Sequence, residues 1–191
     1  KYIYVGRDGR DSVWSTHNHH VNMLDWVYEA LEELPDMGPV IQKPTTDDMR
    51  EYFHDWFNRE GYPFWPFWEN VRAWWAVRDL PNVMMLHYQN LKNDMEGEMR
   101  KLGEFLECEV DESKWEEMVL HCTFDYMKHN AQESAPLQGS LWAGGAETFV
   151  NKGTNDRWRD TLTEEDVAMY ETRADEELGA DCAKWLATGE M

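Results

Sequence analysis

Two short apolar runs, Tyr2–Val5 and Asn82–Tyr88, constrain the fold more than any other feature of the sequence. Both are rich in β-branched, aromatic and long aliphatic side chains, and a long segment of helical periodicity separates them. The mostly apolar character of Asn82–Tyr88 predicts a strand of a parallel sheet that is covered on both faces. Two such strands connected through helices predict an α/β fold with a right-handed crossover.

The first run continues into a basic turn, Gly6–Arg10, and then into a helical pattern. Arg7 is expected at the carboxyl end of the strand, where ligands of open α/β sheets bind. The free N–H groups of the helix start and the helix dipole attract anions, and Arg side chains add charge-assisted hydrogen bonds. Ser15, in the first turns of the helix, can donate to the same anion. The alternative, a plain strand–turn–helix with a solvated arginine, stays open on chemistry alone.

Helical patterns occupy most of the remaining chain, and hydroxyl or acidic residues stand at several of their starts, where they cap free N–H groups. We expect helices over the ranges 11–34, 45–61, 68–80, 94–106 and 163–178, a further helix after Asp111, a loop over 36–44, an aromatic loop over 62–68 and an irregular loop over 131–145.

The composition excludes several classes of function. A net charge of −20 argues against a nucleic-acid partner, which requires a basic footprint, and against an anionic membrane surface. A length of 191 residues predicts one domain. The three cysteines are far apart and form no C-x-x-C pair, so we expect reduced thiols and a cytoplasmic location. No apolar run approaches the length of a membrane helix, and no signal peptide is recognisable.

A histidine cluster at His17, His19 and His20 is a weak candidate for a metal site. No carboxylate or cysteine stands at a convincing offset, and two or three imidazoles alone do not complete a coordination shell. We therefore interpret these side chains as polar histidines on a helix and expect no metal.

The stretch Lys1–Ser15 resembles the cytosolic-type sulfotransferase segment Y-x-x-R-[ND]-P-[KR]-D-x-x-x-S. In that family the Arg and the Ser bind the 3′-phosphate of the sulfuryl donor 3′-phosphoadenosine 5′-phosphosulfate (PAPS). Arg7 and Ser15 keep the spacing of this pair, and Asp11 keeps the acidic position. Gly9 stands where the family usually has Pro, which removes a fixed φ angle but no phosphate ligand.

Two further segments resemble the donor's adenine-binding elements. Tyr88 corresponds to a tyrosine that contacts the adenine in the family run Y-E-D-[LM]-K. Phe124 matches the phenylalanine of H-T-S-F-x-x-M-K-x-N, and Cys122 stands where that pattern has Thr. A thiol is a poorer hydrogen-bond donor than a hydroxyl. Without the resemblance, Phe124 is equally well interpreted as a core residue.

The segment Phe149–Arg159 resembles the second family signature, F-x-R-K-G-x-x-G-D-W-[KR], whose basic pair and glycine backbone hold the 3′-phosphate. Asn151 replaces the usual Arg, so one fixed charge is missing. The resemblance as a whole implies the following donor-binding residues: Arg7, Ser15, Tyr88, Cys122, Phe124, Phe149, Asn151, Lys152 and Gly153.

The resemblance implies a P-loop-NTPase-like α/β fold with a parallel sheet flanked by helices. A complete family member also has a P-loop-like turn, about K-x-G-[TS]-[TS], and a catalytic histidine ahead of the Arg7-type strand. Neither occurs in residues 1–191. We therefore expect a partial sulfotransferase domain, the C-terminal two thirds, that lacks the P-loop portion and the catalytic-histidine segment. No residue of this chain is predicted to be catalytic.

The function implied is in-line transfer of the sulfuryl group of PAPS to a hydroxyl or amine of a small-molecule acceptor, with PAP as product and no metal. This chain supplies mainly the binding of the 3′-phosphate and adenine. Because the P-loop turn and the catalytic histidine do not occur in it, we do not expect the isolated 191 residues to be fully active. The alternatives are a non-catalytic PAP-binding or scaffold remnant and, less favoured, a P-loop kinase-like enzyme, which requires a Walker A motif and Mg²⁺ carboxylates. The sequence leaves the acceptor and the oligomeric state open.

Overall fold

The computed structural model describes residues 1–34, 41–61 and 66–191. The chain divides into two compact units. The first unit comprises Lys1–Gly9, Phe67–Thr123 and Glu164–Met191, and the second comprises Arg10–Pro66 and Phe124–Thr163.

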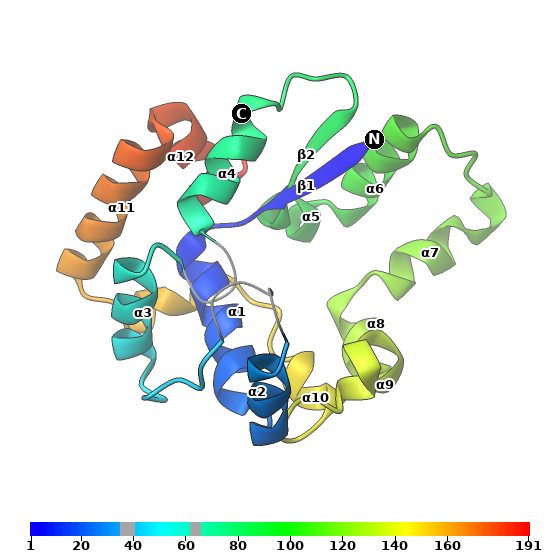
Figure 1. Cartoon of the computed structure of the whole chain (residues 1–191). Coiled ribbons are helices and arrows are strands. Elements are labelled where there is room, and N and C mark those ends of the chain that lie inside the picture. The colour runs from blue at the N-terminus through cyan, green and yellow to red at the C-terminus, as the bar shows by residue number, and fades with distance from the viewer. Residues whose placement is uncertain (35–40, 62–65) are drawn as a thin grey trace. The chain divides into compact units, whose positions relative to one another are not determined.

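A parallel pair of strands forms the centre of the first unit. β1 (Tyr2–Gly6) and β2 (Val83–His87) lie side by side (Figure 1). Their register pairs Gly6 with His87, so both strands end at the same level. This pairing confirms the predicted parallel sheet, although among the described residues the sheet has two strands only.

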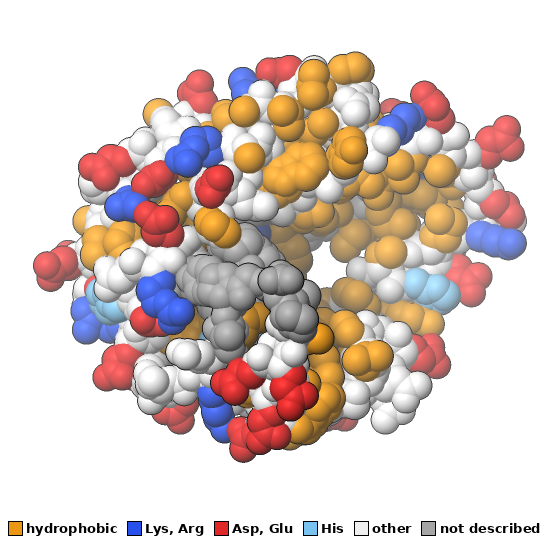
Figure 2. All heavy atoms as spheres, viewed as in Figure 1, with side chains coloured by type: hydrophobic (Ala, Val, Ile, Leu, Met, Phe, Trp, Pro, Cys, Tyr) orange, Lys and Arg blue, Asp and Glu red, His pale blue; other side chains and the backbone are white. Residues whose placement is uncertain are grey.

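The predicted burial of Asn82–Tyr88 on both faces is wrong for most of the strand. In β2 only Leu86 and His87 are buried, and the first three residues are half-buried. In β1 the side chains of Tyr2 and Val5 are 58% and 51% exposed. The apolar side chains of this two-stranded sheet are therefore only partly covered by other elements. Figure 2 shows hydrophobic side chains gathered over the strands.

The helices of the first unit in the described part of the chain are α4 (Phe67–Ala76), α5 (Tyr88–Asn93), α6 (Met95–Leu106), α7 (Trp115–His121), α11 (Glu164–Leu178) and α12 (Ala180–Thr188), with a 3₁₀ turn, η1 (Glu112–Lys114). They confirm the helices predicted over 68–80, 94–106 and 163–178 and after Asp111. The Asp94 carboxylate caps α6, as it accepts a hydrogen bond from Gly97 N at 2.9 Å.

Two features of the first unit differ from expectation. α12 was not predicted, and its Trp185 and Leu186, each 1% exposed, are among the most buried side chains of the unit. The aromatic loop predicted over 62–68 is shorter, since Phe67 and Trp68 are buried residues of α4. Residues 62–65 of that loop lie outside the described part of the chain.

The second unit is helical. Its described elements are α1 (Gly9–Asn22, whose first residue belongs to the first unit), α2 (Asp25–Glu32), α3 (Met49–Asn58), α8 (Phe124–His129), α9 (Ala131–Ser134), α10 (Ala146–Phe149), and the 3₁₀ turns η2 (Pro136–Gly139) and η3 (Arg157–Asp160). The helix predicted from residue 45, with a threonine as its cap, begins instead at Met49, where the Asp48 carboxylate caps it by accepting from Glu51 N at 2.9 Å. Residues 36–40 of the loop predicted over 36–44 are not described.

The single helix predicted over 11–34 is in fact two helices. The backbone leaves the helical path near Met23, which forms an antiparallel bridge with Trp142. Leu24 N donates to Leu141 O at 3.0 Å, and Ala143 N donates to Asn22 O at 2.7 Å. These hydrogen bonds to a distant segment replace the helical ones, so a tertiary contact ends α1 inside a continuous helical pattern.

The irregular loop predicted over 131–145 contains α9 and η2. Ala131, Ala135 and Ala146 form a small buried cluster, against which Phe149 and Val150 pack. Small side chains let these short helical turns approach closely, so the segment is ordered by packing without helical periodicity in its sequence. None of the described helices has both the length and the apolar character needed to cross a membrane.

Candidate functional site

Arg7 and Tyr88 follow directly on the paired ends of β1 and β2. Because Gly6 pairs with His87, the next residue of each strand lies at the same edge of the sheet. The Arg7 guanidinium stands 4.4 Å from the centroid of the Tyr88 ring. A cation–π contact holds an arginine over an aromatic face, and guanidinium groups bind anions through charge-assisted hydrogen bonds. The structure therefore brings together two of the predicted donor-binding residues at the carboxyl edge of the sheet.

The end of β2 is fixed by α12. His87 donates from Nε2 to Leu186 O at 3.0 Å and accepts from Gln89 N at its Nδ1. Burial lowers the pKa of His87, which keeps the ring neutral as this donor–acceptor pattern requires. Trp185 covers the end of β1 so closely that a Cβ at Gly6 would lie 2.3 Å from its ring. These contacts leave little freedom to the strand ends that carry Arg7 and Tyr88.

Gly9, where the family pattern has Pro, is the first residue of α1. Its N–H donates to the Tyr170 hydroxyl at 3.0 Å. A Cβ at this position would lie 2.5 Å from the Tyr170 hydroxyl and 2.8 Å from the Phe67 ring. Proline lacks the N–H and would place extra atoms here, so the tertiary contacts account for glycine at this position.

One face of α1 carries Asp11, Ser15 and Asn18, whose spacings of four and three residues align them along the helix. Asp11 Oδ1 accepts from Asp156 N at 2.8 Å, and Asn18 Nδ2 donates to Thr148 O at 2.9 Å. The segment 148–156, which contains most of the second signature, is thus tied to α1 at both ends, on either side of Ser15. The Ser15 hydroxyl has no hydrogen-bond partner among the described residues.

Phe124 packs directly against the backbone of Gly153. A Cβ on Gly153 would lie 2.3 Å from the Phe124 ring, and the φ of +60° at Gly153 is itself unfavourable for other residues. Lys128, one turn after Phe124 on α8, donates to Glu147 O at 2.7 Å and also to Val150 O. Lys128 matches the lysine of the family pattern H-T-S-F-x-x-M-K-x-N. Its hydrogen bonds hold the backbone at the start of segment 148–156, a role that the sequence analysis did not predict.

The basic side chains near segment 148–156 differ in the contacts that they make. Trp158 lies between Arg10 and Arg159, whose guanidinium carbons are 4.0 and 4.3 Å from its ring. Arg159 also donates from Nε to Asp156 Oδ1 at 2.8 Å. Lys152 is exposed and has no hydrogen-bond or ion-pair partner in the described part of the chain, so its ammonium group is available to an anion.

The remaining predicted donor residues fall into different environments. Phe149 packs against His19 and Trp142, with ring centroids 4.7 Å away in both cases, so packing fully accounts for its place. Asn151 is half-buried beside Lys152. Cys122 is an exposed free thiol at the end of α7.

The histidine cluster is structural, as interpreted from the sequence. His20 is 4% exposed, and its ring nitrogens contact the Tyr52 hydroxyl at 2.9 Å and Gln42 O at 2.7 Å. Burial lowers the pKa of His20 to about 4. His17 Nε2 lies 3.0 Å from Asp47 O. No group of side chains suited to a metal ion occurs within residues 1–34, 41–61 and 66–191.

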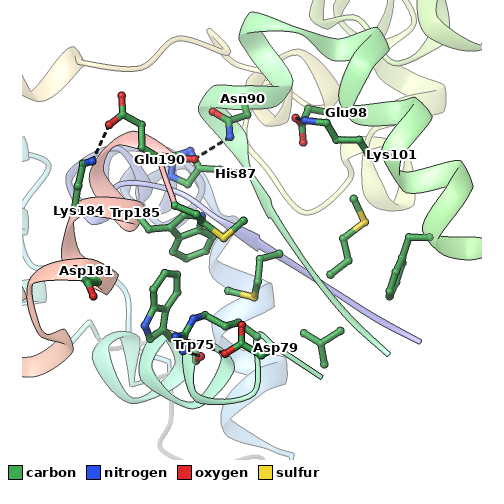
Figure 3. Close-up of a pocket in the computed structure, with 17 residues that line it drawn as sticks. Trp75, Asp79, His87, Asn90, Glu98, Lys101, Asp181, Lys184, Trp185 and Glu190 are labelled. Atoms are coloured by element: carbon green, nitrogen blue, oxygen red, sulfur yellow. Dashed lines mark hydrogen bonds and ion pairs between the residues drawn. The ribbon is translucent and has the colours of Figure 1, made fainter. Parts of the chain in front are cut away.

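A separate hollow of about 820 Å³ lies in the first unit along β2 (Figure 3). Its apolar lining includes Val83, Met84, Met85 and Trp75. Figure 3 shows Lys184 turned toward Glu190, with 3.0 Å between the charged atoms. None of the predicted donor-binding residues lines it. His87 also lines it, so the hollow extends to the carboxyl end of β2, next to Tyr88.

Comparisons with known proteins agree with these observations. A family model for the sulfotransferase domain matches residues 1–181. Sulfotransferase 1C2 of Rattus norvegicus is 27% identical over 165 residues, which are 85% of this chain and 49% of the relative. Luciferin sulfotransferase of Photinus pyralis is 28% identical over 178 residues, or 90% of this chain and 42% of the relative. The chain thus spans about half the length of the curated relatives it matches.

Solved structures resemble the chain as well. Mouse sulfotransferase SULT7A1, complexed with PAP, gives a TM-score of 0.71 at 19% identity and covers 97% of this chain and 61% of its own. At that identity the likeness shows the fold. Retinol dehydratase, in complex with androsterone and inactive cofactor PAP, gives 0.68 at 25% identity, over 92% of this chain and 46% of its own. These likenesses confirm the predicted α/β fold.

Proposed function

Because this chain belongs to the sulfotransferase domain family, we propose that it binds PAPS and PAP and that the protein transfers the sulfuryl group to a hydroxyl or amine of a small-molecule acceptor. The observation that carries the proposal is the attachment of segment 148–156 to α1 on both sides of Ser15. This arrangement presents a hydroxyl, a lysine and a glycine-containing backbone turn, the group types that recognise a phosphate.

In this proposal Ser15 and Lys152 bind the 3′-phosphate, and Asn151 and Gly153 belong to the turn beside it. Phe124 lies against the backbone of Gly153 and offers its ring to the adenine. In the first unit Arg7 donates to phosphate while Tyr88 offers its ring to the adenine. Cys122 and Phe149 complete the proposed donor-binding set.

PAPS, when bound, supplies the sulfuryl group that an acceptor hydroxyl or amine attacks in line. The residues of this chain contribute binding and orientation of the nucleotide, which lower the barrier by holding the reacting groups in place. No residue of the chain is proposed as catalytic, and no metal is required. The prediction that residues 1–191 are one partial domain, its C-terminal two thirds, stays a prediction, as does the cytoplasmic location, which the free thiols Cys108 and Cys122 support.

Calorimetry with PAP and with 5′-AMP, which lacks the 3′-phosphate, tests the proposal. We expect PAP to bind at least tenfold more tightly than 5′-AMP, because one charge-assisted hydrogen bond contributes about 1.5–3 kcal/mol and tenfold corresponds to about 1.4 kcal/mol. Equal affinities would contradict a 3′-phosphate site.

A transfer assay with labelled PAPS and a panel of phenols, alcohols and amines distinguishes an enzyme from a non-catalytic PAP-binding or scaffold protein. We expect at most trace transfer by residues 1–191 alone, since general base catalysis contributes about 10²–10⁴-fold and no base is assigned here. A form extended by an upstream P-loop turn and histidine should be active. Equal rates in both would place the base within this chain.

A further inference from the structure

We propose that Asp11 and Asn18 are positioning residues, which hold the two ends of segment 148–156 on α1 so that Lys152 and Gly153 are arranged for the anion at Ser15. This inference rests on the proposed function and adds two residues that do not themselves contact the nucleotide.

The hydrogen bonds lie at opposite ends of the segment. Asp11 Oδ1 accepts from Asp156 N at 2.8 Å, and Asn18 Nδ2 donates to Thr148 O at 2.9 Å. On an ideal α-helix residues four and three apart share one face, so Ser15 lies between the two anchors. The segment therefore crosses the face of α1 that carries the Ser15 hydroxyl.

The backbone at Asp156 needs this support. Its φ of +65° is a left-handed conformation that residues other than glycine seldom adopt. The family signature has Gly at this position, so Asp156 adopts here a backbone angle normally reserved for glycine. Such an angle persists where neighbouring contacts hold it. Here Asp11 binds the N–H, and the Arg10 guanidinium stacks on the next tryptophan, Trp158, at 4.0 Å.

The charge of Asp11 argues for a positioning role. Asp11 is 4% exposed, and a carboxylate so close to a phosphate site would repel the ligand if it faced it. It binds backbone instead. Holding a binding loop in place before the ligand arrives reduces the ordering cost of binding, so the loss of either anchor should weaken binding without removing any ligand contact.

The test measures PAP affinity by calorimetry for Asp11→Ala, Asp11→Asn and Asn18→Ala in the full chain. Asp11→Asn keeps a side-chain oxygen that can accept from Asp156 N. We expect affinity to fall about three- to tenfold in Asp11→Ala and in Asn18→Ala, as for the loss of one hydrogen bond, and Asp11→Asn to restore most of it.

Tyr52→Phe is the matched control, because it removes a buried hydrogen bond to His20 in the same unit and leaves both anchors unchanged. It should reduce stability with PAP affinity unchanged. A second control is the double variant Asp11→Ala with Lys152→Ala. If Asp11 acts by placing Lys152, the double variant binds PAP no more weakly than Lys152→Ala alone. Additive losses would show that Asp11 does not act through Lys152 and would overturn the proposal as stated for that residue.

Hydrogen exchange of the free chain gives a readout that needs no ligand. Amides of residues 151–155 should exchange faster in Asp11→Ala and Asn18→Ala than in wild type, while Tyr52→Phe leaves them unchanged. If wild type failed to bind PAP, the proposed function would be wrong, and exchange would still decide whether the two residues hold the segment. Unchanged exchange and unchanged affinity in both variants would refute the positioning role.

Discussion

The Arg7 guanidinium lies 4.4 Å over the ring of Tyr88, at the paired carboxyl ends of two parallel strands. We expect Arg7→Ala to weaken PAP binding by about one to two orders of magnitude, since a charge-assisted hydrogen bond contributes about 1.5–3 kcal/mol. Calorimetry measures the change.

Arg78→Ala provides the control for Arg7→Ala. Arg78 also stacks on an aromatic ring, 4.5 Å from the centroid of Trp75, in the same unit. Its loss should lower stability slightly and leave PAP affinity as it was. Equal affinity losses in the two variants would indicate a general effect of removing a stacked arginine and would remove Arg7 from the site.

Gly153→Ala should both destabilise the chain and weaken PAP binding. The new Cβ would lie 2.3 Å from the Phe124 ring, and alanine is disfavoured at a φ of +60°. Gly145→Ala introduces backbone strain without a clash, because Gly145 has φ +69° and ψ −148°, a combination that other residues seldom adopt, and its Cβ meets nothing within 4 Å. Urea unfolding should show a loss of about 1–3 kcal/mol for Gly145→Ala from backbone strain, and in Gly153→Ala the clash with Phe124 adds to the strain.

Only Gly153→Ala is expected to weaken PAP, because only it displaces the ring proposed to contact adenine. Wild-type affinity in this variant would show that the Phe124–Gly153 contact is core packing, the interpretation that the sequence left open.

Gly9→Pro, which restores the family residue, should lower the free energy of unfolding by about 1–3 kcal/mol. Proline is normally favoured at the first residue of a helix, where the N–H is otherwise unpaired. Here that N–H donates to the Tyr170 hydroxyl, and a Cβ would lie 2.8 Å from Phe67. Tyr170→Phe removes the acceptor without crowding and should cost less. An unchanged or higher free energy of unfolding in Gly9→Pro would show that Tyr170 and Phe67 shift to accommodate proline at no measurable cost.

Stability should fall as the pH is lowered from about 6.5 toward 4. Burial lowers the pKa of His20 to about 4, so in this window the unfolded chain binds a proton that the folded chain does not. One such proton reduces the free energy of unfolding by at most about 1.4 kcal/mol per pH unit. Burial also lowers the pKa of His17, His19 and His87, whose contributions have the same sign.

The contribution of His20 is isolated by comparing wild type with His20→Gln. Urea unfolding at pH 7, 6 and 5 should show a shallower loss of stability in the variant. Parallel curves would show that His20 titrates normally and is not buried as a neutral ring.

The sequence by itself determined the parallel pairing of two strands, the basic turn after the first strand and the family to which the chain belongs. These properties depend on local patterns. Alternating and continuous apolar runs indicate strands, and Arg7, Ser15 and Lys152 keep a spacing that the family fold requires. The start of α6 near Asp94 was equally accessible, because capping acts within one turn of the helix, whereas the cap of α3 is Asp48 and not one of the threonines expected there.

The tertiary structure alone decided where α1 ends, why Gly9 replaces Pro and which polar groups hold the signature segment. Each of these depends on residues far apart in the chain. Asn22 meets Ala143, Gly9 meets Tyr170, and Asp11 meets Asp156. A local pattern shows which groups need partners, but it does not show which distant backbone supplies them, because that follows from how the helices pack.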